Sequence, residues 1–203
     1  MHEVALALHN SKALRFGSFK IKSGFQSPYY IDLTRLLSAP KNFRCVVDAI
    51  SDEIGKIMVV DGIDRLASIE LKGALILPSV ASKLNIPSII VRKTRKQYGI
   101  KGRISGGEII NGEQILFFDD VISDGNSKLE GIRPLEDLGA KVKHVLVVVD
   151  REQGGRNIIE GAGYSFHSLM KISDLIEYLL QSKKISENEA RVALDFTKKF
   201  MLA

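Results

Sequence analysis

Residues 115–128 read ILFFDDVISDGNSK, and they decide the fold class of this 203-residue chain. Ile115 to Phe118 form an apolar run that predicts a strand buried on both faces, as in the parallel sheets of α/β proteins. Asp119 and Asp120 follow directly, at the carboxyl end where open α/β sheets bind their ligands. Two neighbouring carboxylates suit the vicinal hydroxyls of a ribose. The stretch therefore predicts a ligand site at the end of a central strand.

The residues after the two acids predict a turn that leads into a helix. Ser123, Asp124, Gly125, Asn126 and Ser127 would bring backbone N–H groups and small hydroxyls to a helix N-terminus, where phosphate binds. Asp124 is unusual in such a turn because a carboxylate repels a phosphate dianion. Its side chain is therefore expected to point away, toward solvent or a nearby base. Taken alone, an ordinary strand with a polar end explains the stretch equally well.

The rest of the chain alternates predicted strands and helices. We expect helices from Val4 to about Leu14 and from Pro40 to Gly55, with short strands at 19–21 and 29–33. Core strands are expected at 65–69, 88–91, 114–118, 142–149 and 164–170. Helices are expected at 78–84, at 127–138 with a break or kink near Pro134, and twice at the C-terminus, the last with a capping box at Ser186. This alternation predicts an α/β fold with a central, mostly parallel sheet flanked by helices.

Composition limits the class of protein. A hydrophobic content of 45% allows a sizeable core, and we expect a single domain over residues 1–203. The single cysteine, Cys45, has no disulfide partner, which favours a reducing compartment and a buried structural thiol. The chain has neither a secretory signal pattern nor an apolar run of membrane-spanning length, so a cytoplasmic location is expected. The net charge of +5 fits nucleic acid, anionic lipid or a polyanionic small substrate.

Four further segments carry polar groups that each have an ordinary structural explanation. Residues 92–107, RKTRKQYGIKGRISGG, hold six basic residues and four glycines, and predict a mobile cationic loop or a solvated basic hairpin. Lys72 and Gly73 follow a strand in residues 68–77, SIELKGALIL. Residues 20–33, KIKSGFQSPYYIDL, combine a lysine, a glycine turn and two tyrosines, while Arg151 ends a strand in residues 148–155, VVDREQGG. Each signal is weak by itself.

Taken together and in this order, the five segments resemble the orotate phosphoribosyltransferases, a branch of the type I phosphoribosyltransferases, over residues 20–155. The resemblance implies the type I sheet with a small N-terminal hood: a hood at about 1–38, a core at about 39–170 and C-terminal helices at about 171–203. It also implies transfer of the phosphoribosyl group of 5-phosphoribosyl 1-pyrophosphate to orotate. The products would be orotidine 5′-monophosphate and pyrophosphate, in the biosynthesis of UMP.

The resemblance implies roles for individual residues as well. Catalysis is expected from Asp119, Asp120, Lys72 and Lys96. The expected contacts of phosphoribosyl pyrophosphate are Lys22, Leu71, Lys72, Arg92, Lys93, Lys96, Tyr98, Asp119, Asp120, Val121, Ile122, Ser123, Asp124, Gly125, Asn126 and Ser127. Those of orotate are Tyr30, Ile31, Ser123 and Arg151. The family often has a non-proline cis peptide in its pyrophosphate loop, which would lie near Glu70–Leu71 here.

The cofactor and partners follow from the same resemblance. Mg²⁺ is expected to be carried by the substrate pyrophosphate, near Asp119 and Asp120. The loop at 92–104 is expected to reach the site of the other subunit in a homodimer, with no nucleic-acid or membrane partner. Two alternatives remain open: another type I phosphoribosyltransferase with a different base, and a non-catalytic regulator that senses phosphoribosyl pyrophosphate. Asp124 in the phosphate turn is the feature that favours the regulator.

Overall fold

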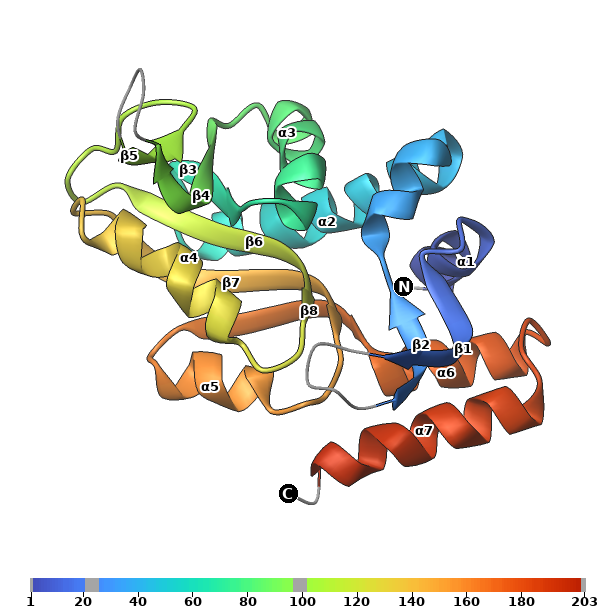
Figure 1. The fold of residues 1–203 in the computed structure, drawn as a ribbon. Coiled ribbons are helices and arrows are strands. Elements are labelled where there is room, and N and C mark those ends of the chain that lie inside the picture. The colour runs from blue at the N-terminus through green and yellow to red at the C-terminus, as the bar shows by residue number, and fades with distance from the viewer. Residues whose placement is uncertain (1, 21–25, 97–101, 202–203) are drawn as a thin grey trace.

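A six-stranded sheet forms the centre of the protein (Figure 1). The computed structural model describes residues 2–20, 26–96 and 102–201, except for the side chains of Arg95, Lys96 and Met201. The strands are β3 (Arg65–Ile69), β4 (Ser88–Lys96), β5 (Gly102–Ser105), β6 (Gln114–Ile122), β7 (Lys141–Asp150) and β8 (Ser165–Lys171). They lie in the order β5-β4-β3-β6-β7-β8, and all neighbours are parallel except β4 and β5. The predicted α/β class with a mostly parallel sheet is confirmed.

Helices cover both faces of this sheet, so its central strands are buried on both sides. One face packs against α1 (His2–Asn10), α2 (Pro40–Val60), α3 (Lys72–Leu84) and α6 (Ile172–Gln181), and the other against α4 (Asn126–Glu136) and α5 (Gly155–Gly161). Successive side chains of a strand point to opposite faces. In β6, Leu116 and Phe118 accordingly join the first core, whereas Ile115 and Phe117 join the second.

A small antiparallel hairpin forms the predicted N-terminal hood. Its strands are β1 (Leu14–Lys20) and β2 (Gln26–Ile31), and the short 3-10 helix η1 (Leu33–Ser38) leads from it to the core. The last helix, α7 (Glu187–Met201), runs along the hairpin (Figure 1). The rings of Tyr29 in β2 and Phe196 in α7 meet edge to face, 5.9 Å apart. The hood is thus held by the C-terminal end of the chain.

Four predicted helix boundaries were wrong. The first helix ends at Asn10 rather than near Leu14, because Lys12 turns the chain with φ of 59° into β1. The second continues past Gly55 to Val60, since the buried Ile54 and Ile57 extend its apolar stripe. The third begins six residues before Pro78, because its first turns bury apolar side chains and a proline only removes one N–H donor there. The fourth runs from Asn126 to Glu136, with Pro134 inside it.

The strands also differ from the predicted ones. The hairpin strands begin earlier than expected, and residues 92–96 and 102–105 form β4 and β5 rather than a loop. Helix α5 was not predicted. The Cys45 thiol is half-buried against the core rather than fully buried. The Ser186 capping box is confirmed, because the Glu189 carboxylate accepts hydrogen bonds from the Ser186 N–H and hydroxyl. Within the described residues, none of the helices has the length and apolar character that a membrane span requires.

Candidate active site

Asp119 and Asp120 lie inside β6 rather than after its end. The pairing of β6 with β7 continues to Ile122, whereas its pairing with β3 ends at Phe117. The carboxylates therefore stand where β6 no longer pairs with β3 and one side of the strand is open. They are 5% and 7% exposed. Uninterrupted apolar residues before them made the strand predictable, but its extra length depends on pairing with β7.

The two carboxylates have different surroundings. Asp119 Oδ1 accepts a hydrogen bond from the Asp120 N–H at 2.9 Å, and Asp119 Oδ2 lies 2.7 Å from the ammonium of Lys128 in α4. Burial and the adjacent Asp119 raise the pKa of Asp120 to about 7, although Lys128 and Lys72 oppose this shift. The ionised form of Asp120 is therefore less favoured than that of an ordinary aspartate.

The predicted phosphate turn leads directly into α4. Gly125 precedes the first helical residue with φ of 80°, and a Cβ there would come within 3.1 Å of the Gly155 carbonyl oxygen. Asp124 is exposed to solvent, as expected, and no basic side chain pairs with it in the described part of the chain. Its Oδ1 accepts a hydrogen bond from the Asn126 N–H at 3.1 Å. One N–H donor of the turn is thus occupied by the protein's own carboxylate.

The pyrophosphate loop lies between β3 and α3, beside the carboxylates. The expected non-proline cis peptide is present at Glu70–Leu71, and Leu71 is exposed just before α3 begins at Lys72. The Lys72 ammonium is 3.2 Å from Asp32 of the hood and 5.6 Å from the centroid of the Tyr30 ring. Burial lowers the pKa of Lys72, but Asp120 and Asp32 outweigh burial and raise it above its ordinary value. Lys72 is therefore a fixed cation at the strand edge.

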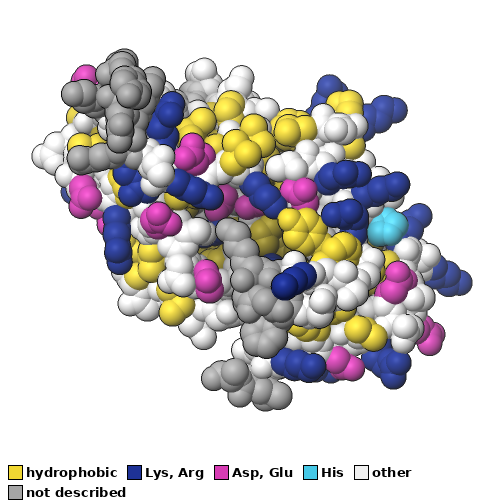
Figure 2. All heavy atoms as spheres, in the orientation of Figure 1, with side chains coloured by type: hydrophobic (Ala, Val, Ile, Leu, Met, Phe, Trp, Pro, Cys, Tyr) yellow, Lys and Arg dark blue, Asp and Glu magenta, His cyan; other side chains and the backbone are white. Residues whose placement is uncertain are grey.

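Basic residues of β4 border the same loop. The Lys93 N–H donates to the Glu70 carboxylate at 2.7 Å, and the Arg92 Nε donates to the Ser105 hydroxyl at 2.9 Å. Lysine and arginine side chains are interspersed with acidic ones across the middle of the face that carries the site (Figure 2). Three expected contacts are not placed: Lys22 and Tyr98 lie outside the described residues, and so does the side chain of Lys96.

Arg151 lies at the end of β7, against the hood. Its N–H donates to the Ile122 carbonyl oxygen at 3.0 Å, and its Nη1 donates to the Ser123 hydroxyl at 3.3 Å. The guanidinium carbon lies 5.1 Å from the centroid of the Tyr29 ring. Arg151 Nε, Arg151 Nη2 and the Tyr29 hydroxyl are buried and have no hydrogen-bond partner in the described part of the chain. Buried donors of this kind fit a polar ligand that would complete their bonds.

The hood tyrosines divide differently from the sequence expectation. Tyr30 is half-buried, with its ring 5.6 Å from that of Phe19, whereas Ile31 is buried in the core beneath the hairpin. Tyr29 is not among the expected contacts of orotate, yet it is the tyrosine that faces Arg151. Strand alternation explains this, because Tyr29 and Ile31 point to the same face of β2 and Tyr30 to the other.

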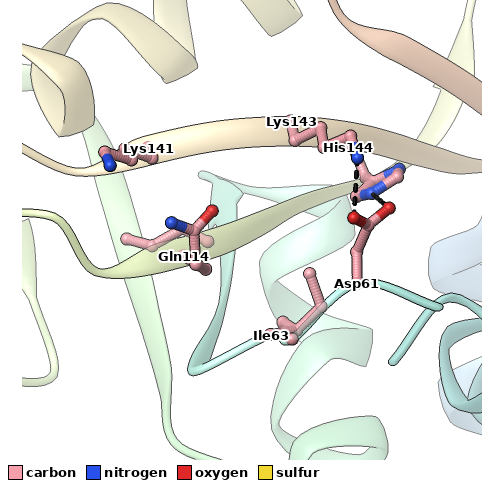
Figure 3. Close-up of a pocket in the computed structure, with 8 residues that line it drawn as sticks. Asp61, Ile63, Gln114, Lys141, Lys143 and His144 are labelled. Atoms are coloured by element: carbon pink, nitrogen blue, oxygen red, sulfur yellow. Dashed lines mark hydrogen bonds and ion pairs between the residues drawn. The ribbon is translucent and has the colours of Figure 1, made fainter. Parts of the chain in front are cut away.

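A second hollow lies at the opposite edge of the sheet, where β6 and β7 begin (Figure 3). It has a volume of about 190 Å³ and is lined by Asp61, Gly62, Ile63, Gln114, Ile115, Lys141, Lys143 and His144. The Asp61 carboxylate lies 2.6 Å from the Lys143 ammonium and 3.0 Å from His144 Nε2. His144 Nδ1 is in turn 3.0 Å from His167 Nε2. These polar groups already satisfy one another, so the cluster acts as a structural clamp.

Comparisons with known proteins agree with this geometry. A model of the phosphoribosyl transferase domain matches residues 33–166. The orotate phosphoribosyltransferase of Archaeoglobus fulgidus is 40% identical over 81% of this chain and 85% of its own. The chain belongs to the orotate phosphoribosyltransferase family.

Solved structures of an orotate phosphoribosyltransferase and of a UMP synthase share the fold. The enzyme of Aeropyrum pernix superimposes with a TM-score of 0.77 at 26% identity, over 87% of this chain and 97% of its own. The UMP synthase of Leishmania donovani gives a TM-score of 0.85 at 29% identity and covers 98% of this chain. This chain spans 42% of that longer protein.

Two residues of the site were missed by sequence reasoning. Lys128 occupies the inward stripe of α4 with Ile132 and Leu135, at the spacing of buried positions. A lysine at an apolar position of a helix was the signal that could have found it. Gly73 is the other, because a Cβ there would come within 2.5 Å of Asp119 Oδ1. No sequence pattern predicts the close contact between Gly73 and Asp119 in this member of the orotate phosphoribosyltransferase family.

Proposed function

We propose that this protein transfers the phosphoribosyl group of 5-phosphoribosyl 1-pyrophosphate to orotate, with release of orotidine 5′-monophosphate and pyrophosphate. The observation that carries the proposal is the grouping, at one edge of the sheet, of a carboxylate pair, the turn before α4 and the unpartnered donors of Arg151. The first two parts suit a phosphoribosyl group. Arg151 suits the anionic, oxygen-rich edge of orotate, because a guanidinium can donate two parallel hydrogen bonds.

Displacement at the sugar carbon develops positive charge on the ring and negative charge on the leaving pyrophosphate. The buried carboxylate of Asp120 would hold the ribose hydroxyls and favour the cationic ring. Lys72, Arg92, Lys93 and Lys96 would bind the departing pyrophosphate, the first of them at the loop beside β3. Orotate is already an anion, so no strong general base is required. Positioning and electrostatics therefore supply most of the rate enhancement.

The carboxylates also fit the expected magnesium ion. Magnesium prefers hard oxygen ligands and is usually held by one or two carboxylates together with substrate phosphates. Both oxygens of Asp119 are already bonded, whereas the Asp120 carboxylate has no ion pair among the described residues and only the Val121 N–H as a donor. Asp120 would therefore be the protein ligand, beside the pyrophosphate oxygens. The bound ion would neutralise charge on the leaving group.

The proposal includes a homodimer in which residues 92–104 of one subunit serve the site of the other. The hairpin of β4 and β5 supports it, because β4 places Arg92 and Lys93 beside the loop that contains Glu70. A cytoplasmic location is part of the same proposal.

The direct test is the loss of orotate absorbance when the purified protein is mixed with phosphoribosyl pyrophosphate and Mg²⁺. Formation of orotidine 5′-monophosphate should require all three components. A panel of adenine, hypoxanthine, guanine and uracil tests the nearest alternative, another base for the same chemistry. Turnover of any of these bases at a higher kcat/KM than orotate would contradict the proposal, and binding without turnover would point to a regulator.

A further inference from the structure

Lys128 is a buried lysine with three acceptors around its ammonium group. It is 5% exposed, in the first turn of α4. Its Nζ lies 2.7 Å from Asp119 Oδ2, donates to the Val121 carbonyl oxygen at 2.5 Å and to the Ser127 hydroxyl at 3.3 Å. An ammonium carries three N–H donors, so each has an acceptor. A buried charge is costly unless it is paired and hydrogen-bonded, and here it is both.

These contacts make the carboxylate pair asymmetric. Asp119 is bonded at both oxygens, by Lys128 and by the Asp120 N–H. Gly73 closes the space beside it, because a Cβ at that position would come within 2.5 Å of Asp119 Oδ1. Asp119 is thus held in one position. Asp120 has no ion pair among the described residues, only the Val121 N–H beside its carboxylate, and is the carboxylate free to meet a ligand.

We infer that Lys128 is a positioning residue that acts on the reaction through Asp119. It keeps Asp119 in one orientation, so that Asp119 fixes the backbone of Asp120 while Asp120 meets the ribose of phosphoribosyl pyrophosphate. The bonds to Val121 and Ser127 hold the ammonium in place between β6 and α4. This role rests on the proposed function, and the sequence pattern did not predict it for Lys128.

Removal of the Lys128 ammonium tests this role. With Lys128 replaced by methionine, Asp119 loses the ion pair at its Oδ2, and the bond that joins α4 to the Val121 carbonyl oxygen is lost as well. Asp119 can then turn, so the Asp120 backbone that it fixes is positioned less well toward phosphoribosyl pyrophosphate. A purely structural role of Lys128 would instead affect the two substrates alike.

The experiment compares Lys128→Met with wild type and with Lys83→Met, which removes an exposed ion pair to Asp48. Lys128→Met should lower kcat/KM for phosphoribosyl pyrophosphate by about tenfold or more, with a smaller effect on KM for orotate. Lys83→Met should match wild type. Equal losses toward phosphoribosyl pyrophosphate and orotate, accompanied by a lower melting temperature, would overturn the inference.

A second variant keeps the test decisive if Lys128→Met does not fold. Asp119→Asn/Lys128→Met removes both buried charges and should fold, since a neutral pair of similar shape can replace a buried ion pair. Because Lys128 acts through Asp119, the double variant should have the same kcat/KM for phosphoribosyl pyrophosphate as Asp119→Asn alone. A further loss, multiplied onto that of Asp119→Asn, would overturn the inference. Absence of product with wild type and Lys83→Met would instead refute the proposed function.

Discussion

The guanidinium carbon of Arg151 lies 5.1 Å from the centroid of the Tyr29 ring, so the end of β7 meets the hood across the proposed base site. Arg151 Nε and Nη2 have no partner in the described part of the chain. We expect Arg151→Ala to raise KM for orotate by roughly tenfold or more, because a charged hydrogen bond to the base is lost. KM for phosphoribosyl pyrophosphate should change much less. Steady-state kinetics with each substrate varied measures both.

Arg156→Ala is a matched control for that variant. Arg156 also lies over an aromatic ring, 5.0 Å from the centroid of Phe166, but it belongs to α5. It should leave both Michaelis constants near wild type. Equal increases of the two constants in Arg151→Ala would assign Arg151 to the structure or to the phosphates.

Asp119→Asn and Asp120→Asn should each slow turnover by at least about tenfold, a loss of ~1.4 kcal/mol in transition-state stabilisation. The two losses of turnover should have different causes, because Asp119 pairs with Lys128, whereas burial and Asp119 raise the pKa of Asp120 to about 7. In wild type, kcat/KM for phosphoribosyl pyrophosphate should rise with pH through this value as Asp120 ionises. Asp120→Asn should lose that limb. Wild-type kinetics in both variants would refute the proposed role of the Asp119–Asp120 carboxylate pair.

Asp124→Asn should improve the binding of phosphoribosyl pyrophosphate. The Asp124 carboxylate accepts a hydrogen bond from the Asn126 N–H within the phosphate turn, where a negative charge repels phosphate. Asparagine keeps an acceptor oxygen but removes the charge, so KM should fall by about two- to fivefold. Asp137→Asn, at the other end of α4, is the control and should have no effect. An unchanged KM in Asp124→Asn would show that this charge does not oppose the substrate.

His167 should make the stability of the fold depend on pH. Burial, and then His144, lower the pKa of His167, so the unfolded chain binds a proton more readily than the folded protein does. The free energy of unfolding is therefore highest above pH 6.5, the pKa of histidine in the unfolded chain, and it decreases as the pH falls below that value. The loss should stay below about 1 kcal/mol, because solvent screens this half-exposed group. Urea unfolding at pH 7.5 and 5.5 measures the difference.

Two variants complete this measurement. His167→Gln should flatten the dependence on pH, since the titrating group is gone. Gln114 also lines the nearby hollow, but Gln114→Ala removes no titrating group. This variant should therefore keep the wild-type dependence of the unfolding free energy on pH. A wild-type slope in His167→Gln would place the titration elsewhere.

Sharing of sites between subunits can be tested by complementation. Inactive Lys96→Ala and Asp119→Asn/Asp120→Asn proteins, mixed and allowed to exchange subunits, should form heterodimers with one intact site and one doubly defective site. In an equal statistical mixture, activity should approach about one quarter of wild type. Verified exchange without recovery, or a fully active monomer, would contradict the shared-site arrangement.

The sequence by itself determined the fold class, and its resemblance to the orotate phosphoribosyltransferases supplied the expected site residues. The apolar run before Asp119 required a strand buried on both faces, and β6 is such a strand. The cis peptide at Glu70–Leu71 lies where the resemblance put it. The strand was predictable because its apolar run is local, and parallel strands align their carboxyl ends on the same side of a sheet.

Only the tertiary structure decided which side chains complete the site. Lys128 meets Asp119 because α4 packs over β6, and Tyr29 meets Arg151 because the hood folds onto the end of β7. The length of β6 beyond Phe118 likewise depends on its pairing with β7. These contacts join segments whose relative positions are set by packing of the whole core. The conformational propensity of a segment does not include such packing, so these contacts could not be predicted from each segment by itself.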